Sequence, residues 1–241
     1  MKFIKKHIKL IIFLIVCMVT FFIYQKYQDQ RVTYTAIGDG FAGGINSFHD
    51  KSYGYSDYLR DYLEKEDNLK NYYHNFTYSD MTIKDLYKDI LLNAHDQENN
   101  NIRQVLRESN LLTISVGIND LIYKADVEKN ISEYKETKIM EEIMDNFDRM
   151  IEEVRKYYQN DIIIIGYYNF YSQNSVERTL LDNLNKKLKE YSKKNHLIFV
   201  DNSNLNSNLD DYLDNPNTFY PNHLGYEKIF NNICSSSNIG C

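Results

Sequence analysis

The sequence predicts a three-layer α/β fold, in which a parallel sheet is covered by helices on both sides. Strand-like and helix-like segments alternate along most of the chain, as they do in repeated βαβ units. The strand-like segments are apolar throughout, and one contains four consecutive isoleucines, Ile162–Ile165. Such a strand is buried on both faces. The length of 241 residues, with 26% of them charged, suits one folded domain, residues 31–241, preceded by a short extra segment.

The extra segment, residues 1–30, has the composition of a membrane anchor. Residues 1–9 contain four lysines, and residues 10–24 are uncharged and almost wholly apolar. An apolar stretch of this length falls between a signal-peptide core and a full membrane span of ~20 residues. Because Lys9 can snorkel, residues 8–25 reach spanning length and are the expected membrane contact.

We favour an uncleaved signal anchor over a cleaved signal peptide, because no small-residue cleavage site follows the apolar stretch. The positive-inside tendency then keeps the lysine-rich tip in the cytoplasm. The predicted protein crosses the cell membrane once, with the domain of residues 31–241 outside the cell. Secretion after cleavage of a signal peptide is the alternative.

The individual elements of the domain follow from local patterns. Apolar residues recur every three or four positions in the helical segments, and the strands are short apolar runs. In chain order we expect strands at residues 32–37, 71–78, 111–116, 161–166 and 197–200, and helices at residues 53–66, 79–93, 102–108, 131–159, 176–194 and 223–232. Ser79 or Asp80 is the expected cap of the second helix, and the Asn/Asp/Ser-rich residues 202–217 predict a long loop.

Ligands of parallel sheets bind beyond the carboxyl ends of the strands. The loops that follow Gly38, Tyr73, Val116 and Gly166 are therefore the expected place of a functional site.

Charge and cysteine content narrow the classes of partner. Beyond Arg31 the chain has 22 basic and 33 acidic residues, a formal charge of −11, which disfavours nucleic acid and other anionic polymers. Cys234 and Cys241 could close a small disulfide loop outside the cell, and two unpaired thiols are nearly as well supported.

No Cys/His cluster has the spacing of a metal site, so we expect neither a metal nor a cofactor.

Five sequence blocks resemble the SGNH/GDSL hydrolase family, in the family's order, over roughly residues 32–233. The blocks are Gly38-Asp39-Gly40, Tyr53-Gly54-Tyr55, Asn75 to Thr82, Gly117-Ile118-Asn119-Asp120, and Phe219-Tyr220-Pro221-Asn222 with Gly225-Tyr226. Each block alone is weak, but their order on an alternating α/β pattern is specific. The end of the fourth strand, Ile165 to Phe170, is similar to the bacterial lipase/acylhydrolase-like branch. The resemblance implies a flavodoxin-like parallel sheet.

The resemblance also assigns positions to the family's catalytic groups. In the family a serine attacks an ester carbonyl, a histidine takes its proton, and an aspartate three residues earlier orients the histidine. In this chain the nucleophile position is Gly40, the acid position is Asn217 and the base position is Tyr220. A glycine cannot form an acyl-enzyme, and a tyrosine is a poor base at neutral pH.

The oxyanion-hole positions that the resemblance implies are Gly40, Asp80 and Asn119. A carboxylate at Asp80 would repel a developing oxyanion, and Asn119 is equally suited to tying neighbouring loops together. No catalytic residue is therefore intact. Residues that we expect to line a pocket at this edge are Asp39, Phe41, Gly117, Tyr168 and His223; His223 is expected to begin the last helix rather than to act as a base.

These losses predict a membrane-anchored extracellular pseudo-hydrolase of SGNH/GDSL type. It would be a binding or interaction module for a cell-envelope glycan, a lipid or a partner protein. The alternative is an active esterase, lipase or O-deacetylase that uses a remodelled site.

Overall fold

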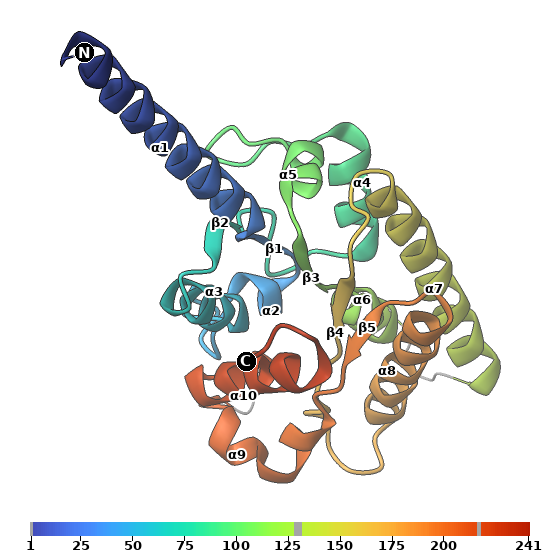
Figure 1. The fold of residues 1–241 in the computed structure, drawn as a ribbon. Helices are drawn as coiled ribbons and strands as arrows, with labels where there is room; N and C mark the ends of the chain where they lie inside the picture. The colour runs from blue at the N-terminus through green and yellow to red at the C-terminus, as the bar shows by residue number, and fades with distance from the viewer. Residues whose placement is uncertain (1, 128–131, 216–217) are drawn as a thin grey trace.

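The computed structural model describes residues 2–127, 132–215 and 218–241, and its centre is a five-stranded parallel sheet (Figure 1). The strands are β1 (Val32–Gly38), β2 (Leu69–Tyr73), β3 (Leu111–Ser115), β4 (Ile162–Ile165) and β5 (Ile198–Val200). Their spatial order is β2-β1-β3-β4-β5, and every neighbouring pair is parallel. This is the flavodoxin-like order, so the predicted fold class is confirmed.

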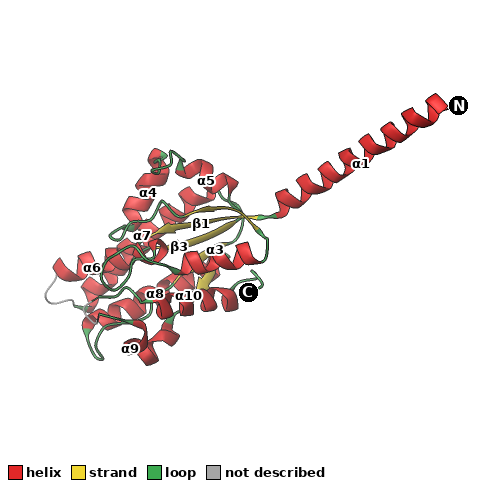
Figure 2. Cartoon of the chain, turned by 90° about the vertical axis from the view of Figure 1, so that its left-hand side faces the viewer, coloured by secondary structure: helices red, strands yellow, loops and turns green. Residues whose placement is uncertain are grey.

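Helices cover both faces of the sheet. The helical elements are α1 (Lys2–Gln30), α2 (Gly40–Gly43), α3 (Tyr55–Lys65), α4 (Ile83–Leu92), α5 (Ile102–Glu108), α6 (Ile118–Val127), α7 (Glu133–Arg155), α8 (Val176–Lys194), the 3₁₀ helix η1 (Ser203–Asn208), α9 (Leu209–Tyr212) and α10 (His223–Ser236). α3 and α10 pack together on one face, whereas α4, α7 and α8 form a continuous layer on the other (Figures 1 and 2).

The apolar strand sequences place the core where expected. Ile162–Ile165 are buried on both faces of β4, and β1 is buried from its second residue onward. The edge strand β2 is only half-buried, which explains why its sequence mixes aromatic and polar residues. The prediction placed this strand at residues 71–78, but it begins at Leu69 and ends at Tyr73 because the chain then turns into a site loop.

Several helix predictions need correction. α4 is capped by Thr82, whose hydroxyl accepts a hydrogen bond from the backbone N–H of Asp85, and not by Ser79 or Asp80. α6 was not predicted from the sequence, because residues 117–120, which follow β3, were interpreted only as a loop. The predicted loop of residues 202–217 contains η1 and α9. The predicted start of the long helix at Ile131 lies outside the described residues; in the described part, α7 ends at Arg155 rather than residue 159.

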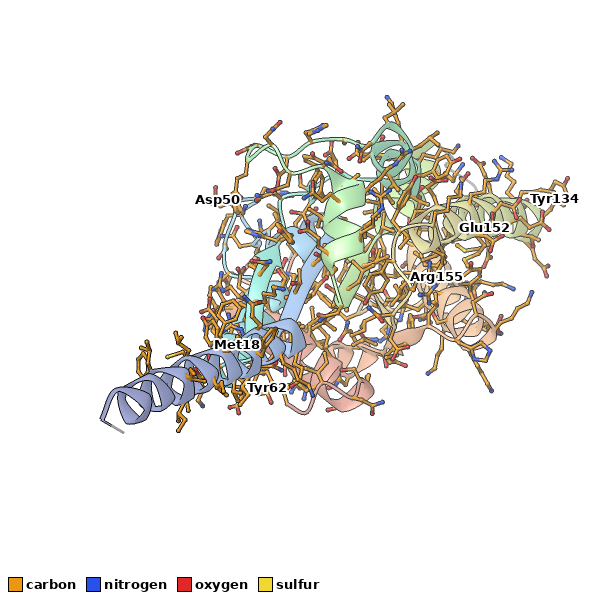
Figure 3. All side chains as sticks on the ribbon, turned by 45° about the horizontal axis from the view of Figure 1, so that its top comes forward. Met18, Asp50, Tyr62, Tyr134, Glu152 and Arg155 are labelled. Atoms are coloured by element: carbon orange, nitrogen blue, oxygen red, sulfur yellow. A yellow bond between two sulfur atoms is a disulfide. The ribbon has the colours of Figure 1, made fainter. Side chains whose placement is uncertain are left out.

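The N-terminal helix α1 stands apart from the domain. Its residues Leu10–Tyr27 are long and apolar enough to cross a membrane or to act as a signal sequence. Figure 3 shows Met18 on the part of α1 that extends beyond the folded body, where its side chain is exposed. At its base, the Tyr27 hydroxyl donates to a carboxylate oxygen of Asp67 at 2.9 Å, and Arg31 forms an ion pair with the same carboxylate at 3.4 Å.

The two C-terminal cysteines are joined. Cys234 and Cys241 form a disulfide that closes the end of the chain against α10. The hydroxyl of Tyr62 in α3 donates to the carbonyl oxygen of Gly240 at 2.9 Å. The disulfide alternative of the sequence analysis is therefore the one that the structure shows.

Candidate functional site

The loops that follow β1, β2 and β3 meet at the carboxyl edge of the sheet. The N–H of Gly38 donates to the carbonyl of Phe76 at 3.1 Å, and the N–H of Asp39 donates to the carbonyl of Ser115 at 2.7 Å. The chain turns at Gly38, whose φ of 126° and close approach to the Ser115 carbonyl exclude a side chain. Immediately beyond this turn, Asp39 caps the short helix α2 and Gly40 begins it.

Asp39 is the buried polar centre of the site. One carboxylate oxygen accepts hydrogen bonds from the Ser115 hydroxyl at 2.7 Å and from the N–H of Phe41 at 3.1 Å. The other accepts from the Tyr167 hydroxyl at 2.6 Å. Its side chain therefore ties the ends of β1, β3 and β4 together and also bonds nearby backbone.

Burial controls the charge state of Asp39. Loss of solvent raises its pKa to about 7, although the three donors favour the charged form. Complete burial, with the neighbouring carboxyl group of Asp39 as a further cause, holds the pKa of Tyr167 well above its usual value. The carboxyl group of Asp39 and the hydroxyl group of Tyr167 are therefore joined by a hydrogen bond inside the core.

The space next to Gly40 is filled by the side chain of Tyr220. A Cβ atom placed on Gly40 would lie 2.5 Å from Cε1 of Tyr220 and 2.6 Å from both its Cζ and its hydroxyl oxygen. Real Cβ atoms essentially never approach other atoms within 3.0 Å. A serine at position 40 is therefore incompatible with Tyr220 in its present position.

Tyr220 is held in this position from several sides. Its ring lies 5.8 Å from that of Phe41 and 4.4 Å from that of Phe219, measured between centroids. Its hydroxyl donates to the carbonyl of Ser79 at 2.6 Å, and its own carbonyl accepts from the Ser47 hydroxyl at 2.6 Å. The side chain is 2% exposed, so it is part of the core. Burial raises its pKa further above the usual tyrosine value, which removes it from base chemistry near neutral pH.

Asn119 joins the site from the first turn of α6. Its amide nitrogen donates to the carbonyl oxygens of Ser79 and Met81, both at 3.0 Å. The donor that could contact an oxyanion is therefore engaged by the loop between β2 and α4. The next residue, Asp120, accepts from the N–H of Ile83 at 2.9 Å, so both residues tie this loop to α6; for Asn119 this is one of the two roles considered from the sequence.

The structure brings some of the predicted residues together and separates others. Tyr220 and Asn119 meet at the carbonyl of Ser79, and Gly40 lies against the Tyr220 ring, whereas Asp80 is exposed on the loop. His223 is exposed at the first position of α10, as expected. The acid position, Asn217, lies outside the described residues.

The expectation that Asp39, Phe41 and Tyr168 line an open pocket requires correction. All three have no exposed surface, and Gly117 is also buried. The physical reason is aromatic packing: the Phe41 ring contacts those of Tyr167, Tyr168, Phe219, Tyr220 and Tyr226. Tyrosine side chains occupy the volume in which a ligand would be bound.

Three residues contribute contacts to the site that the sequence did not predict. His49 lies edge-on to Tyr220 with ring centroids 5.5 Å apart, and it adopts a left-handed φ of 64°. Ser47 is fully buried and bonds the Tyr220 carbonyl. The Tyr226 hydroxyl donates to the carbonyls of Gly40 and Ile45 at 3.2 and 2.5 Å. The available signals were proximity to Gly40 in the chain for Ser47 and His49, and membership of the fifth block for Tyr226.

The fold and the loop arrangement define an SGNH-type hydrolase scaffold. A model of the GDSL-like lipase/acylhydrolase family matches residues 36–228. The chain belongs to that family.

Solved structures with the same fold include esterases and lipases. A lipase from a goat rumen metagenome superposes with a TM-score of 0.69 at 18% identity, covering 85% of this chain and 96% of that one. An acetylxylan esterase from Geobacillus stearothermophilus gives 0.61 at 16%, with 84% and 92% covered. An α/β hydrolase from a Lake Arreo metagenome gives 0.59 at 16%, with 84% and 93% covered. No curated protein matches the chain.

Proposed function

We propose that this protein is a non-catalytic member of its family, a pseudo-hydrolase that acts as a binding or interaction module at the cell envelope. The single observation that carries the proposal is the packing of Tyr220 against Gly40. The family's nucleophile position is occupied by Gly40, and its base position by Tyr220. The Tyr220 ring fits only because residue 40 has no side chain. Each residue explains the other, as expected if a hydrolytic site has been converted into core.

The state of Asn119 supports the same proposal. An oxyanion hole needs donors that are aimed at a developing charge and are free to meet it. The Asn119 amide bonds two backbone carbonyls instead, and one of them also accepts from Tyr220. Removal of one oxyanion donor costs about 100- to 1,000-fold in rate. In this chain the nucleophile is absent as well, because the Tyr220 ring fills the space next to Gly40.

We further propose that α1 is an uncleaved anchor and that the domain lies outside the cell. The Cys234–Cys241 disulfide supports an oxidising location. α1 ends at Gln30 and β1 begins at Val32, so the amino ends of the strands face the membrane. The seven residues of β1 at ~3.3 Å each put the carboxyl edge about 20 Å further away. This favours a glycan or protein ligand over a bilayer lipid.

Chemical labelling tests the proposal against the enzyme hypothesis. We expect a fluorophosphonate probe to label no serine of the folded, purified full-length protein, whereas an active serine hydrolase is modified covalently. A labelled serine identified by peptide mass spectrometry, at a position whose substitution abolishes ester turnover, would establish the remodelled enzyme instead.

Reconstruction of the family site is the complementary test. The combined substitutions Gly40→Ser, Asp80→Gly, Asn217→Asp and Tyr220→His restore each family group and remove the tyrosine ring that excludes the serine. The matched control is Gly40→Ser alone, which retains the ring. We expect esterase activity from the fourfold variant and none from the control.

A further inference from the structure

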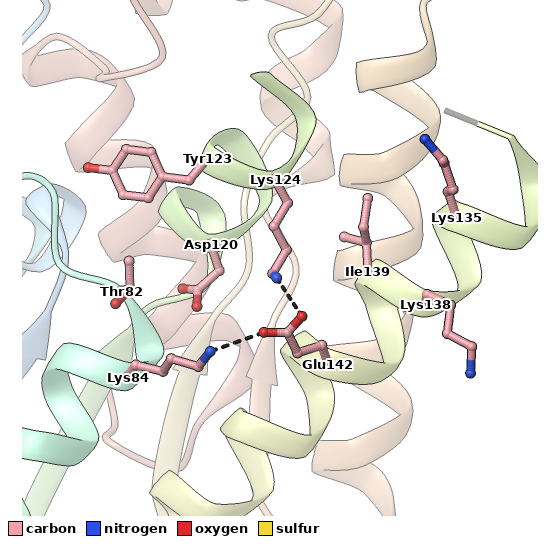
Figure 4. A pocket seen from close by; sticks show the side chains of 9 residues that line it. All are labelled: Thr82, Lys84, Asp120, Tyr123, Lys124, Lys135, Lys138, Ile139 and Glu142. Atoms are coloured by element: carbon pink, nitrogen blue, oxygen red, sulfur yellow. Dashed lines mark hydrogen bonds and ion pairs between the residues drawn. The ribbon is translucent and has the colours of Figure 1, made fainter. Parts of the chain in front are cut away.

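A cavity of about 500 Å³ lies beside the site, between the start of α4, the middle of α6 and the first half of α7 (Figure 4). Four of its lining residues are lysines: Lys84 on α4, Lys124 on α6, and Lys135 and Lys138 on α7. The domain as a whole is acidic, with 22 basic and 33 acidic residues beyond Arg31. The basic lining is therefore a local departure from the charge of the domain.

A single carboxylate lies at the centre of this lining. One oxygen of Glu142 is 3.0 Å from Nζ of Lys84, and the other is 2.6 Å from Nζ of Lys124 (Figure 4). The three residues come from three helices that are distant in the sequence. Hydrogen bonds from the two ammonium groups lower the pKa of Glu142. The cavity thus holds two cations at the correct separation to bind one carboxylate group between them.

The remaining walls offer an aromatic ring and a carboxyl group that already takes part in the fold. Tyr123 is 50% exposed, and its ring can pack against the apolar face of a sugar ring. Asp120 is buried and bonded to the N–H of Ile83, and burial raises its pKa to about 6. The acidic groups that line the cavity are thus Asp120, already engaged in the fold, and Glu142.

We propose that this cavity binds a carboxylate-bearing sugar, and that Glu142 occupies the place of the ligand carboxylate when the cavity is empty. The volume is within the range of small-molecule sites. The proposal rests on the proposed function, because it gives the binding module a ligand class. The cavity lies at the carboxyl edge, since α4 follows β2 and α6 follows β3. That edge is opposite α1, which favours a soluble or wall-borne sugar over an anionic lipid headgroup.

Titration with digalacturonate tests the proposal, using full-length protein in zwitterionic nanodiscs and isothermal calorimetry. We expect binding that weakens from low to physiological ionic strength, and no binding of the neutral disaccharide cellobiose. Glu142→Gln removes the competing carboxylate, so affinity should rise about tenfold. Lys124→Gln should lower it about tenfold. The control is Lys189→Gln, because Lys189 on α8 also forms an ion pair with a carboxylate, that of Asp201, but does not line the cavity; this substitution should leave affinity unchanged.

Stability of the variants keeps the outcomes interpretable. Glu142→Gln breaks exposed ion pairs, each worth little, so it should fold, and digalacturonate should raise its Tm more than that of the native protein. Failure of both the native protein and this variant to bind digalacturonate overturns the proposal. So does an equal loss from Lys124→Gln and Lys189→Gln, or Lys124-dependent binding to anionic lipid vesicles alone. Ester turnover is measured separately, so a catalytic result would refute the proposed function without deciding this site.

Discussion

Replacing Gly40 by alanine probes the packing on which the proposed function depends. The new Cβ would lie 2.5 Å from the Tyr220 ring, roughly 1 Å inside ordinary contact distance. The ring cannot move away freely, because Phe219 packs on it and its hydroxyl bonds the Ser79 carbonyl. Gly40 has no left-handed φ, so the cost is steric rather than conformational.

The expected magnitude follows from overpacking. Adding a methyl group to a filled core costs about 1–3 kcal/mol, and alanine recovers up to ~1 kcal/mol of helix propensity over glycine. We expect Gly40→Ala to lower the free energy of unfolding by about 1–2 kcal/mol. Tyr220→Ala alone should cost about 3–5 kcal/mol through the cavity it leaves. In that background the methyl group enters vacant space, so the cost of Gly40→Ala should disappear.

A double-mutant cycle measures this coupling. Urea unfolding can be followed by tyrosine fluorescence, since the chain has 22 tyrosines and no tryptophan. The predicted interaction energy between positions 40 and 220 is about 1–3 kcal/mol. Gly43→Ala is the matched control, because it lies on the same short helix and its Cβ would be 3.1 Å from the Thr77 hydroxyl. Equal costs of Gly40→Ala in both backgrounds would refute the packing argument.

Three other predictions concern the charge, the loops and the C-terminus. Because burial raises the folded-state pKa of Asp39 to about 7, above its ordinary value of ~3.9, the folded state binds the proton more tightly, and its contribution to stability falls as pH rises from about 4 to 7. Asp39→Asn should remove this fall; urea midpoints across that range test it, and an unchanged slope contradicts it. Asn119→Ala leaves loop carbonyls without their donor and should cost about 1–3 kcal/mol, seen as a lower Tm; an unchanged Tm would mean that the amide ties nothing. Cys241→Ser opens the loop to Cys234 and should cost about 2 kcal/mol, while maleimide should label Cys234 in the variant in addition to Cys17, the free cysteine that it can also label in the native chain.

The fold was predictable because its signals are local. Four consecutive isoleucines mark β4, and the helices that face the sheet repeat apolar residues at the expected spacing. What failed were elements whose partners are distant in the sequence. α6 begins within the Asn119 block, so its helical pattern was masked by a motif, and η1 and α9 form in a polar stretch, in which α9 packs beside α10.

For the site, the sequence predicted which residues occupy the family's catalytic positions, but not how their side chains pack. The sequence indicated that Gly40 and Tyr220 occupy related places, but not that one ring fills the space of the other. That contact joins residues 180 positions apart and depends on the direction of a side chain. For the same reason Phe41 and Tyr168 were expected to line a pocket: composition does not distinguish a ring that faces a ligand from a ring that fills the core.

The rate of p-nitrophenyl acetate hydrolysis by the purified full-length protein tests the central claim most directly. The filled site predicts a rate equal to that of the detergent blank, or a weak background that Tyr220→Phe and Asn119→Ala leave unchanged. A rate above the blank that falls when either substitution is made, in protein that remains folded, would contradict the account and show that this edge of the sheet still performs ester hydrolysis.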